Sequence, residues 1–478
     1  MTTRDRKQDR VARSAPFPHA PVVALIVLFF ILMLPNLNNS YPYQGDETFY
    51  TVSAMNMIDR GEYLSPSYAG EYRFNKPILT YWVAVSAYKL FGVSMWSARV
   101  PILLLACLTI FTTYRCALFT LGDRRKALLA AAMLASSPMF FSFSRVAMTE
   151  MVLVFFTVPA VLMFAKAMAD CGQAARYSAL GSAFVGLAFM TKGPVGLLPY
   201  AAALIHCSFS NRPEKRRLLS ALVNPLNLAI VAAIAVPWYA YAASSHPAAF
   251  ASDMGTESQT LGDNPVVGLV KRLLFYGYTL AIYLFPFSLA GTLLTIKRRV
   301  LWSKSCAFIG TYIVIHCLTF ILFVGVHKSR YLLPIVPLLC IVLADVLFPS
   351  GWKSWMKTAG TVLFLQAVFY AAHPFVAHEA LRELTDKWKD GYSAAGTLGT
   401  TLEMKRAGWC RLYANNRNIV APEVADFLII GDADLRQYAG WEIIGTAVQR
   451  SSPGWSQGKV SFKNVMFHLV RRPERDPR

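Results

Sequence analysis

The sequence predicts an α-helical protein that crosses a membrane many times. Of its 478 residues, 55% are hydrophobic and only 15% are charged, and the mean hydropathy is +0.40. Apolar windows of about twenty residues, the length that a helix needs to span the hydrocarbon core, recur along most of the first 374 residues. Lys and Arg also gather in alternate loops between these windows. Together these observations indicate a polytopic membrane protein.

About eleven windows have the length and composition of a spanning helix, by the twenty-residue rule. They lie near residues 20–37, 97–119, 126–142, 150–168, 177–191, 194–209, 222–243, 272–295, 305–325, 331–348 and 356–374. A basic N-terminus, residues 1–19, precedes the first window. No small-residue cleavage site follows this window, so we expect an uncleaved first span and not a signal peptide.

The distribution of basic residues predicts which loops share a face of the membrane. The basic loops are the N-terminus and residues 124–126, 212–217, 297–299 and 353–357. Because cytoplasmic loops carry an excess of Lys and Arg, we expect all of these at the cytoplasmic face. The net charge of +20 then reflects topology, and no nucleic-acid partner is implied. Most remaining charged residues near the membrane would lie at the outer face.

The first outer loop, residues 38–96, carries the most informative charges. Asp46 and Glu47 are adjacent carboxylates just after the first span, where acids lose hydration and need partners, so they are candidate functional residues. The aromatic and apolar segment 78–91 is predicted to be an interfacial helix, because counting it as a span would invert every later loop. Asp46 and Lys76 would then flank one cavity. A Lys76 that only snorkels toward headgroups is an equally good interpretation.

The composition changes after residue 375. Gly, charged residues and short alternating patterns replace the long apolar windows. Strands are predicted at 426–431 and 460–470, and a helix at 379–389. We therefore expect a small mixed α/β domain at 375–478, outside the membrane on the outer face, following a transmembrane domain at 20–374.

Several motifs in consistent order carry a resemblance to a known family. They are GDETFY at 45–50, FNKPILTYW at 74–82, ARVP at 98–101, SSPMF at 136–140, FMTKGP at 189–194 and KSRYLLP at 328–334. Together they resemble the C-type (GT-C) membrane glycosyltransferases. Within these, the chain is most similar to the lipid A 4-amino-4-deoxy-L-arabinose transferase and protein mannosyltransferase-like family. The resemblance covers roughly residues 20–350.

The resemblance implies a reaction and its partners. A sugar would pass from a polyprenyl (undecaprenyl) phosphate carrier to lipid A or another envelope glycan, at the periplasmic face of the bacterial inner membrane. Direct displacement would invert the anomeric configuration. Such chemistry needs a carboxylate that positions or deprotonates the acceptor, and cations that neutralise the departing phosphate. Membrane lipids would be the other partners.

The resemblance also implies residue roles. Asp46 matches the acid that acts as base or orients the acceptor, and Glu150 matches a second acid that is commonly aspartate in the family. Glu47 is a supporting member of this catalytic group, because a helical segment would point it elsewhere. Lys76 matches the lysine that binds the carrier phosphate. Arg272 sits where the family often places a second phosphate-binding cation.

A cationic cluster is predicted at an outer helix mouth, formed by Lys328, Arg330 and Tyr331. It could bind the donor phosphate or anchor the helix to lipid headgroups. Lys192, in a Gly-Pro turn, could cap the turn or take part in catalysis. Both choices stay open from sequence.

No metal site and no required cofactor are expected. Some members of the family place a glutamate directly before the phosphate-binding lysine as a metal ligand, and this chain has Asn75 there. A solvent divalent cation at the acidic pair is left open. Two other functions also stay open: a protein O-glycosyltransferase of the same superfamily, and a lipid or sugar transporter, which would show inverted repeats or broken helices near mid-membrane.

Overall fold

A computed structural model describes most of the chain. The described residues are 19–35, 37–38, 46–68, 70–209, 213–258, 265–298, 303–324, 328–376, 380–394, 397–400, 422, 424–450, 454–456, 459–461 and 464–473. Most of the predicted basic N-terminus, residues 1–18, lies outside this set.

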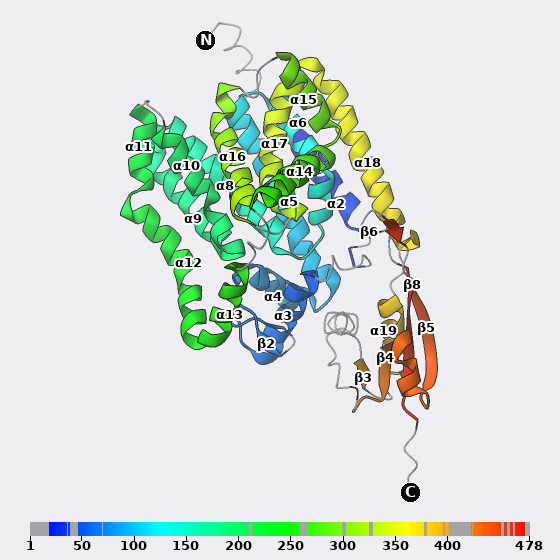
Figure 1. Cartoon of the computed structure of the whole chain (residues 1–478). Coiled ribbons are helices and arrows are strands. Elements are labelled where there is room, and N and C mark those ends of the chain that lie inside the picture. The colour runs from blue at the N-terminus through cyan, green and yellow to red at the C-terminus, as the bar shows by residue number, and fades with distance from the viewer. Residues whose placement is uncertain are drawn as a thin grey trace.

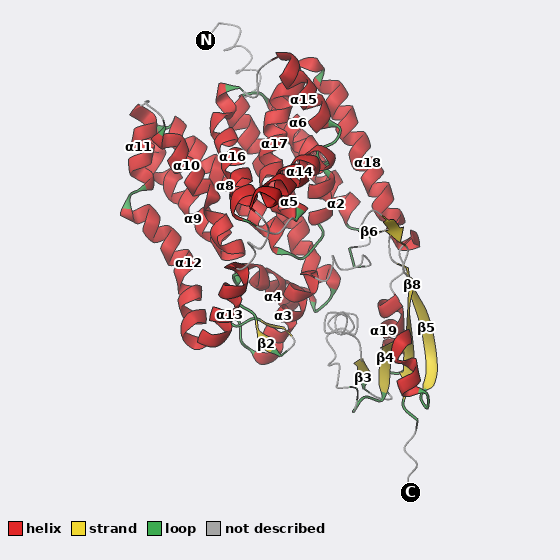
Figure 2. Ribbon diagram, viewed as in Figure 1, coloured by secondary structure: helices red, strands yellow, loops and turns green. Residues whose placement is uncertain are grey.

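Helices make up nearly all of the chain before residue 376 (Figures 1 and 2). They are α2 (Ala20–Met33), α3 (Asp46–Arg60), α4 (Leu79–Phe91), α5 (Met95–Leu121), α6 (Arg124–Ala135), α7 (Pro138–Phe143), α8 (Thr149–Ala169), α9 (Ala174–Lys192), α10 (Leu198–Ser208), α11 (Pro213–Leu222), α12 (Pro225–Ser245), α13 (Pro247–Ser258), α14 (Pro265–Tyr283), α15 (Phe287–Arg298), α16 (Ala307–Phe323), α17 (Val336–Leu347) and α18 (Trp352–Val376). Two short 3-10 segments matter for the site, η2 (Gly193–Leu197) and η4 (Ser329–Ile335).

The helical membrane fold is confirmed, whereas the number of about eleven spans stays a prediction. Among the described residues, six helical stretches are long and apolar enough to cross a membrane, or seven if a bent pair counts as one span. The window at 126–142 is interrupted after α6, and α7 begins at Pro138. The window at 272–295 bends by 108° between α14 and α15. This break contains Pro286, which has no N–H for a helical hydrogen bond.

Local sequence sets where the helices around the site begin and end. Ser94 caps α5 with its side chain and Ser97 returns the bond, which forms a capping box. At the end of α9, Gly193 has a φ of +63°, which glycine tolerates without strain. The chain then turns so sharply that a Cβ at Gly196 would lie 2.3 Å from the Ala188 carbonyl carbon. A side chain at Gly196 is therefore excluded.

The first loop is a compact structured unit beside the helical body. It contains α3, α4 and a small hairpin of β1 (Ser67–Tyr68) and β2 (Glu71–Tyr72). Tyr50 on α3 packs against Tyr81 on α4, with ring centroids 5.3 Å apart. The predicted helix at 78–91 is confirmed as α4, and it is not one of the helices long enough to span. Within the loop, α4 packs against α3, and it also packs against α5 and α9 of the helical body (Figure 1).

The last part of the chain forms a separate α/β unit beyond the end of α18 (Figure 1). Its four-stranded sheet has the order β3 (Leu398–Thr400), β4 (Phe427–Gly431), β8 (Asn464–Arg471) and β5 (Glu442–Arg450). β3 pairs in parallel with β4, and the other pairs are antiparallel. The amphipathic helix α19 (Ala380–Gly391) packs on β5 and β8. The predicted strands near 426–431 and 460–470 thus correspond to β4 and β8.

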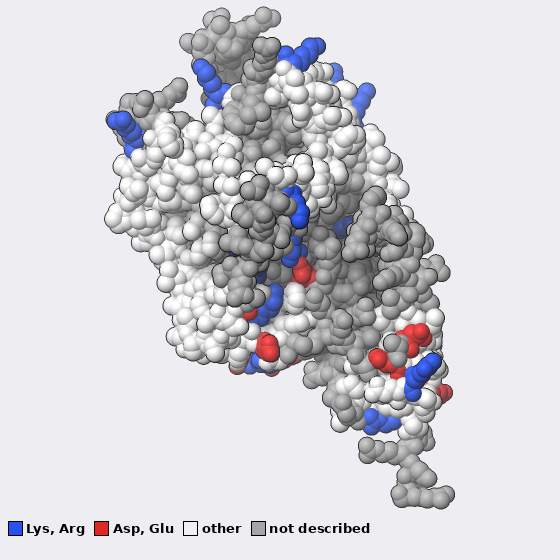
Figure 3. Space-filling view, viewed as in Figure 1, with Lys and Arg blue, Asp and Glu red and all other residues white. Residues whose placement is uncertain are grey.

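Basic residues gather at one end of the helical body. Figure 3 shows Lys and Arg side chains at the end near the N-terminus, α11 and α15. At this end the first turn of α6 meets the end of α17 and the start of α18: the Arg125 guanidinium lies 5.5 Å from the Trp352 ring centroid, and Lys126 bonds Asp345 at 2.6 Å. Two of the basic loops that were predicted to share a face therefore lie together.

Candidate active site

Four charged side chains from distant parts of the sequence form a continuous chain of ion pairs. Asp46 Oδ2 lies 2.6 Å from Arg330 Nη1, and Arg330 Nε lies 3.2 Å from Glu150 Oε1. Lys192 Nζ lies 2.9 Å from the same oxygen of Glu150. The predicted residues Asp46, Glu150 and Arg330 are thus neighbours, and Lys192 joins them.

The positions of these groups on their helices favour their charges. Asp46 and Glu150 lie in the first turns of α3 and α8, where the helix dipole stabilises negative charge. Lys192 lies in the last turn of α9, where the dipole stabilises positive charge. The short segment η4 brings Arg330 between the two acids. Two helix N-termini and one helix C-terminus therefore meet at this point.

The cluster is largely withdrawn from solvent. Glu150 is 2% exposed and Arg330 is 9% exposed. Buried charges are tolerated only when they are paired, and removal of one partner leaves the other uncompensated. Asp46 is the more accessible end of the chain of ion pairs, since a quarter of its side chain (26%) is exposed. Of the two acids, Asp46 is therefore the one that an incoming acceptor can reach.

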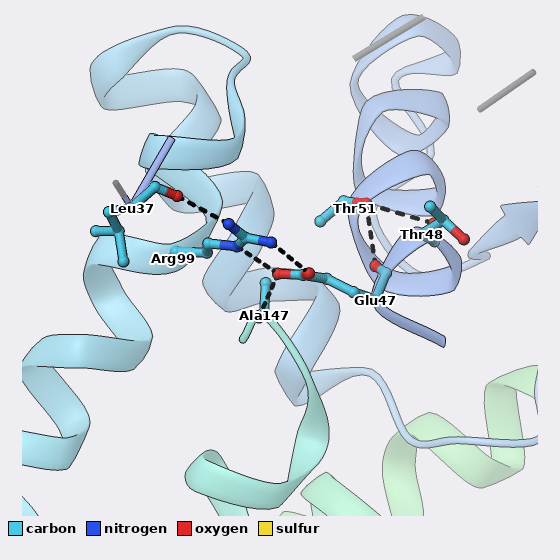
Figure 4. Close-up of polar contacts among 6 residues, drawn as sticks. All are labelled: Leu37, Glu47, Thr48, Thr51, Arg99 and Ala147. Carbon is cyan, nitrogen blue, oxygen red and sulfur yellow. Dashed lines mark hydrogen bonds and ion pairs between the residues drawn. The ribbon is translucent and has the colours of Figure 1, made fainter. Parts of the chain in front are cut away.

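Glu47 points away from Asp46 into a second ion pair (Figure 4). Arg99 donates from Nε to Oε1 and from Nη2 to Oε2 of Glu47, at 2.8 and 2.7 Å. The backbone N–H of Ala147 also donates to Oε1 at 2.8 Å, and Arg99 Nη1 donates to the Leu37 carbonyl at 2.9 Å. Glu47 is fully buried. This geometry joins α3, α5 and the loop before α8.

Lys76 lies at the edge of the same charge cluster, between the β1–β2 hairpin and α4. Burial and the positive charges of Lys192, Arg73 and Lys328 together lower the pKa of Lys76 to about 7, against the opposite effect of Glu150. Binding of an anion next to such an amine would raise its pKa and favour its charged form. The site thus has the electrostatics of an anion-binding site.

Tyr331 and Arg272, the other residues predicted to bind the carrier phosphate, occupy different surroundings. Tyr331 lies beneath Lys192, whose Nζ is 4.8 Å from the ring centroid, and its ring stacks on Phe320 at 5.0 Å. His316 Nε2 lies 2.8 Å from the Tyr331 carbonyl oxygen and holds this part of η4 in place. Arg272 donates from Nε to the Ile321 carbonyl at 2.6 Å. Arg272 is therefore tied to α16.

The acids of the site are engaged by cations. No group of three His, Cys, Asp or Glu side chains that could hold a metal ion occurs in the part of the chain that the structure describes. Asp46 and Glu150 are each held by cationic side chains, which would compete with a metal ion for the same oxygens.

Two site residues were not assigned by the sequence. Lys192 was left between a turn cap and a catalytic role, yet it lies within the buried cluster. Arg73 lies only three residues before Lys76 and acts on its pKa, and no sequence motif singles it out. Its only local signal is a basic residue between two aromatic residues, Tyr72 and Phe74, in an outer loop. This signal also describes an ordinary membrane anchor.

Comparisons with known proteins find similar sequences over part of the chain. A family model described as dolichyl-phosphate-mannose-protein mannosyltransferase matches residues 75–241. An uncharacterized protein of Aquifex aeolicus is 27% identical over 359 residues, covering 73% of this chain and 67% of that protein. The undecaprenyl phosphate-alpha-4-amino-4-deoxy-L-arabinose arabinosyl transferase of Serratia proteamaculans is 25% identical over 228 residues. That match covers 47% of this chain and 40% of the Serratia enzyme.

A solved structure has the same fold over almost the whole chain. The crystal structure of ArnT from Cupriavidus metallidurans bound to undecaprenyl phosphate superimposes with a TM-score of 0.71 and 13% sequence identity. The superposition covers 95% of this chain and 98% of that chain. It therefore includes the helical body and extends into the C-terminal α/β unit.

Proposed function

We propose that this chain is a C-type membrane glycosyltransferase, which transfers a sugar from a polyprenyl phosphate carrier to lipid A or another envelope glycan. The reaction would take place at the periplasmic face of the bacterial inner membrane. Support comes from the arabinosyl transferases among its relatives and from the undecaprenyl phosphate bound to ArnT. No cofactor is required in this proposal.

The observation that carries the proposal is the meeting of one accessible carboxylate with several cations. Asp46 is placed to accept the acceptor proton or to orient the acceptor oxygen. Lys76 and Lys328 supply positive charge for the carrier phosphate, and Arg330 and Lys192 hold Asp46 and Glu150 in place. Glu150 would keep the two cations correctly aimed, and it is not itself the base. Arg272 on α14 and Tyr331 on η4 would also help to bind the carrier phosphate.

Glu47 has a different part in this proposal. Its carboxylate is fully buried and accepts hydrogen bonds from Arg99 and from the Ala147 N–H. We propose that Glu47 holds the first turn of α3 in position, and that this turn positions Asp46. The catalytic step is an inverting displacement, in which the acceptor oxygen attacks the anomeric carbon opposite the departing phosphate.

The proposal is tested with the full-length protein in lipid nanodiscs. The substrates are undecaprenyl phosphate carrying a labelled 4-amino-4-deoxy-L-arabinose and, as acceptor, lipid A. We expect labelled lipid A from the wild type and a loss of at least about 100-fold in turnover for Asp46→Asn, the scale of one acid–base group. Asp59→Asn, at the exposed end of α3, is the matched control and should be fully active.

Four outcomes would redirect the assignment. Label on polypeptide would indicate a protein O-glycosyltransferase. Movement of intact donor across vesicles without cleavage would indicate a transporter. Full activity of Asp46→Asn would remove Asp46 from the mechanism, and a product with the anomeric configuration of the donor would exclude a single displacement.

A further inference from the structure

Arg73 is a cation at the site with no acidic partner among the described residues. Its guanidinium carbon lies 4.0 Å from the Phe49 ring centroid, and its Nε is buried without a hydrogen-bond partner in the described part of the chain. The acids around it are engaged elsewhere: Glu150 with Lys192 and Arg330, and Asp46 with Arg330. A buried donor without a partner is costly, and its presence needs an explanation.

The backbone around Arg73 is held rigidly. The N–H of Arg73 donates to the Pro66 carbonyl at 2.8 Å, and the N–H of Phe74 donates to Asp253 Oδ2 at 2.5 Å. The Phe74 side chain is fully buried against aromatic residues of α12 and α13, including Trp238 at 6.1 Å. These contacts fix the backbone position of Arg73 next to β2 and α13.

Arg73 faces the same groups as Lys76. Its positive charge lowers the pKa of Lys76, after the larger effects of burial and of Lys192. Burial raises the pKa of Tyr81, and the nearby Arg73 guanidinium partly offsets this increase. Arg73 thus lies between α3, α4 and the loop of Lys76. Figure 3 shows basic and acidic side chains gathered near the middle of the visible face.

Several cationic side chains act on one another around Lys76. Arg73, Lys192 and Lys328 each lower the pKa of Lys76, whereas Glu150 raises it. Glu150 is itself held by Lys192 and Arg330, and Asp253 accepts from the Phe74 N–H. A phosphate group supplies up to two negative charges and several acceptor oxygens.

We infer that Arg73 is a further ligand of the carrier phosphate and acts most strongly on the phosphate as it departs. This inference rests on the proposed function. In the transfer, the bond from the anomeric carbon to the phosphate oxygen breaks, and its electron pair stays on that oxygen. The acceptor oxygen forms the new bond to the anomeric carbon, and its proton goes to the base. The carrier changes from a phosphodiester with one negative charge to a phosphomonoester with two.

An arginine suits this departing group better than a lysine. Its planar fork presents parallel N–H donors to two phosphate oxygens, and its charge does not depend on pH. Interactions that strengthen as charge develops raise the rate of the chemical step. The predicted signature is therefore a larger effect of Arg73 on the monoester than on the diester.

The test uses full-length protein in nanodiscs and two probes, undecaprenyl monophosphate and its methyl diester. For Arg73→Gln, we expect monoester binding to weaken by at least about tenfold, the scale of a charged hydrogen bond, with a smaller loss for the diester. Arg73→Lys should recover part of the monoester affinity. Arg60→Gln is the matched control, because Arg60 is in the same loop and faces an aromatic ring, Tyr72, at 5.9 Å.

Phosphorus NMR of the bound monoester separates ligation from packing. The second pKa of a free phosphomonoester is about 6, and surrounding cations should hold it lower in the wild-type complex. Arg73→Gln should move it upward, and Arg60→Gln should not. If Arg73→Gln loses affinity equally for both probes and leaves this pKa unchanged, Arg73 has only a packing role. If the wild type binds neither probe, the proposed function itself fails.

Discussion

At the scale of single residues, the site combines one accessible acid with several cations. Lys76 is the residue whose protonation responds to these cations, because burial and three neighbouring cations lower its pKa to about 7. Lys192 and Arg330 differ from it in having Glu150 as a direct partner. Binding of an anion should therefore be linked to proton uptake at Lys76.

The pH dependence of this binding has a definite sign. Below pH 7, Lys76 is already charged, and affinity for a phosphate should not vary with pH. As pH rises above about 7, the free protein loses the Lys76 proton, whereas a bound anion favours the charged form and raises its pKa in the complex. Affinity should then fall by up to about tenfold per pH unit, until the pKa of the complex is reached.

A phosphodiester carrier is the appropriate ligand, because it does not titrate in this range. Calorimetry in buffers of different ionisation enthalpy should show proton uptake at pH 8 and none at pH 6. Lys76→Met should abolish both the uptake and the pH slope. Lys89→Met, which removes an exposed lysine of α4 that faces Tyr63, should preserve both. A slope that persists in Lys76→Met would assign the titration to another group.

At the scale of elements, the Glu47–Arg99 pair joins three segments that carry the site. It connects the first turn of α3 to α5 and, through the Ala147 N–H, to the loop that leads into α8. Both side chains are buried, at 0% and 1% exposure. Asp46 and Glu150 therefore receive their relative positions from a pair that does not contact the substrate.

This pair should be sensitive to the loss of one partner. Arg99→Ala should destabilise the protein by about 3–5 kcal/mol, because Glu47 would remain as an uncompensated buried carboxylate. The double variant Glu47→Leu with Arg99→Met should recover much of this stability but keep low activity, since Asp46 is no longer held. Thermal unfolding in detergent and turnover are the two measurements.

The partly exposed pair Lys126–Asp345 at the other end of the molecule is the control. Lys126→Ala should cost no more than about 1 kcal/mol, as for surface pairs. An Arg99→Ala protein as stable as Lys126→Ala would show that Glu47 is reached by water or neutralised. It would also remove the proposed anchor of α3.

Sequence patterns predicted elements more reliably than contacts between them. Long apolar windows and a basic–apolar alternation were enough for the helices, because both signals are local. Asp46, Glu150 and Arg330 could be proposed because they lie in motifs, but no local pattern states that Arg330 bridges the two acids. The role of Lys192 depended on where α9 ends relative to α8. The span count depended on breaks at Ser136–Pro138 and Pro286, which hydropathy averages over.

At the scale of the whole molecule, the charges are separated between two ends. The loops at one end carry basic residues such as Arg125 and Lys126, and the ion-pair cluster lies with the first loop toward the other end (Figures 1 and 3). The α/β unit follows α18 and lies toward the same end as the first loop (Figure 1). Because basic loops stay in the cytoplasm, this arrangement predicts that the site and the α/β unit face the periplasm together.

The orientation can be measured with single cysteine reporters in a variant without native cysteines. Exposed positions are available in all three regions: Glu62 in the first loop, Lys353 in the first turn of α18, and Glu442 on β5. In intact cells with a permeabilised outer membrane, an impermeant maleimide should label Glu62→Cys and Glu442→Cys. Lys353→Cys should be labelled only after the inner membrane is opened. If Lys353→Cys were labelled first, the site would face the cytoplasm and the donor would have to bind there. If Glu442→Cys behaved like Lys353→Cys, α18 would not place the α/β unit on the side of Asp46, and this unit could not cover the site.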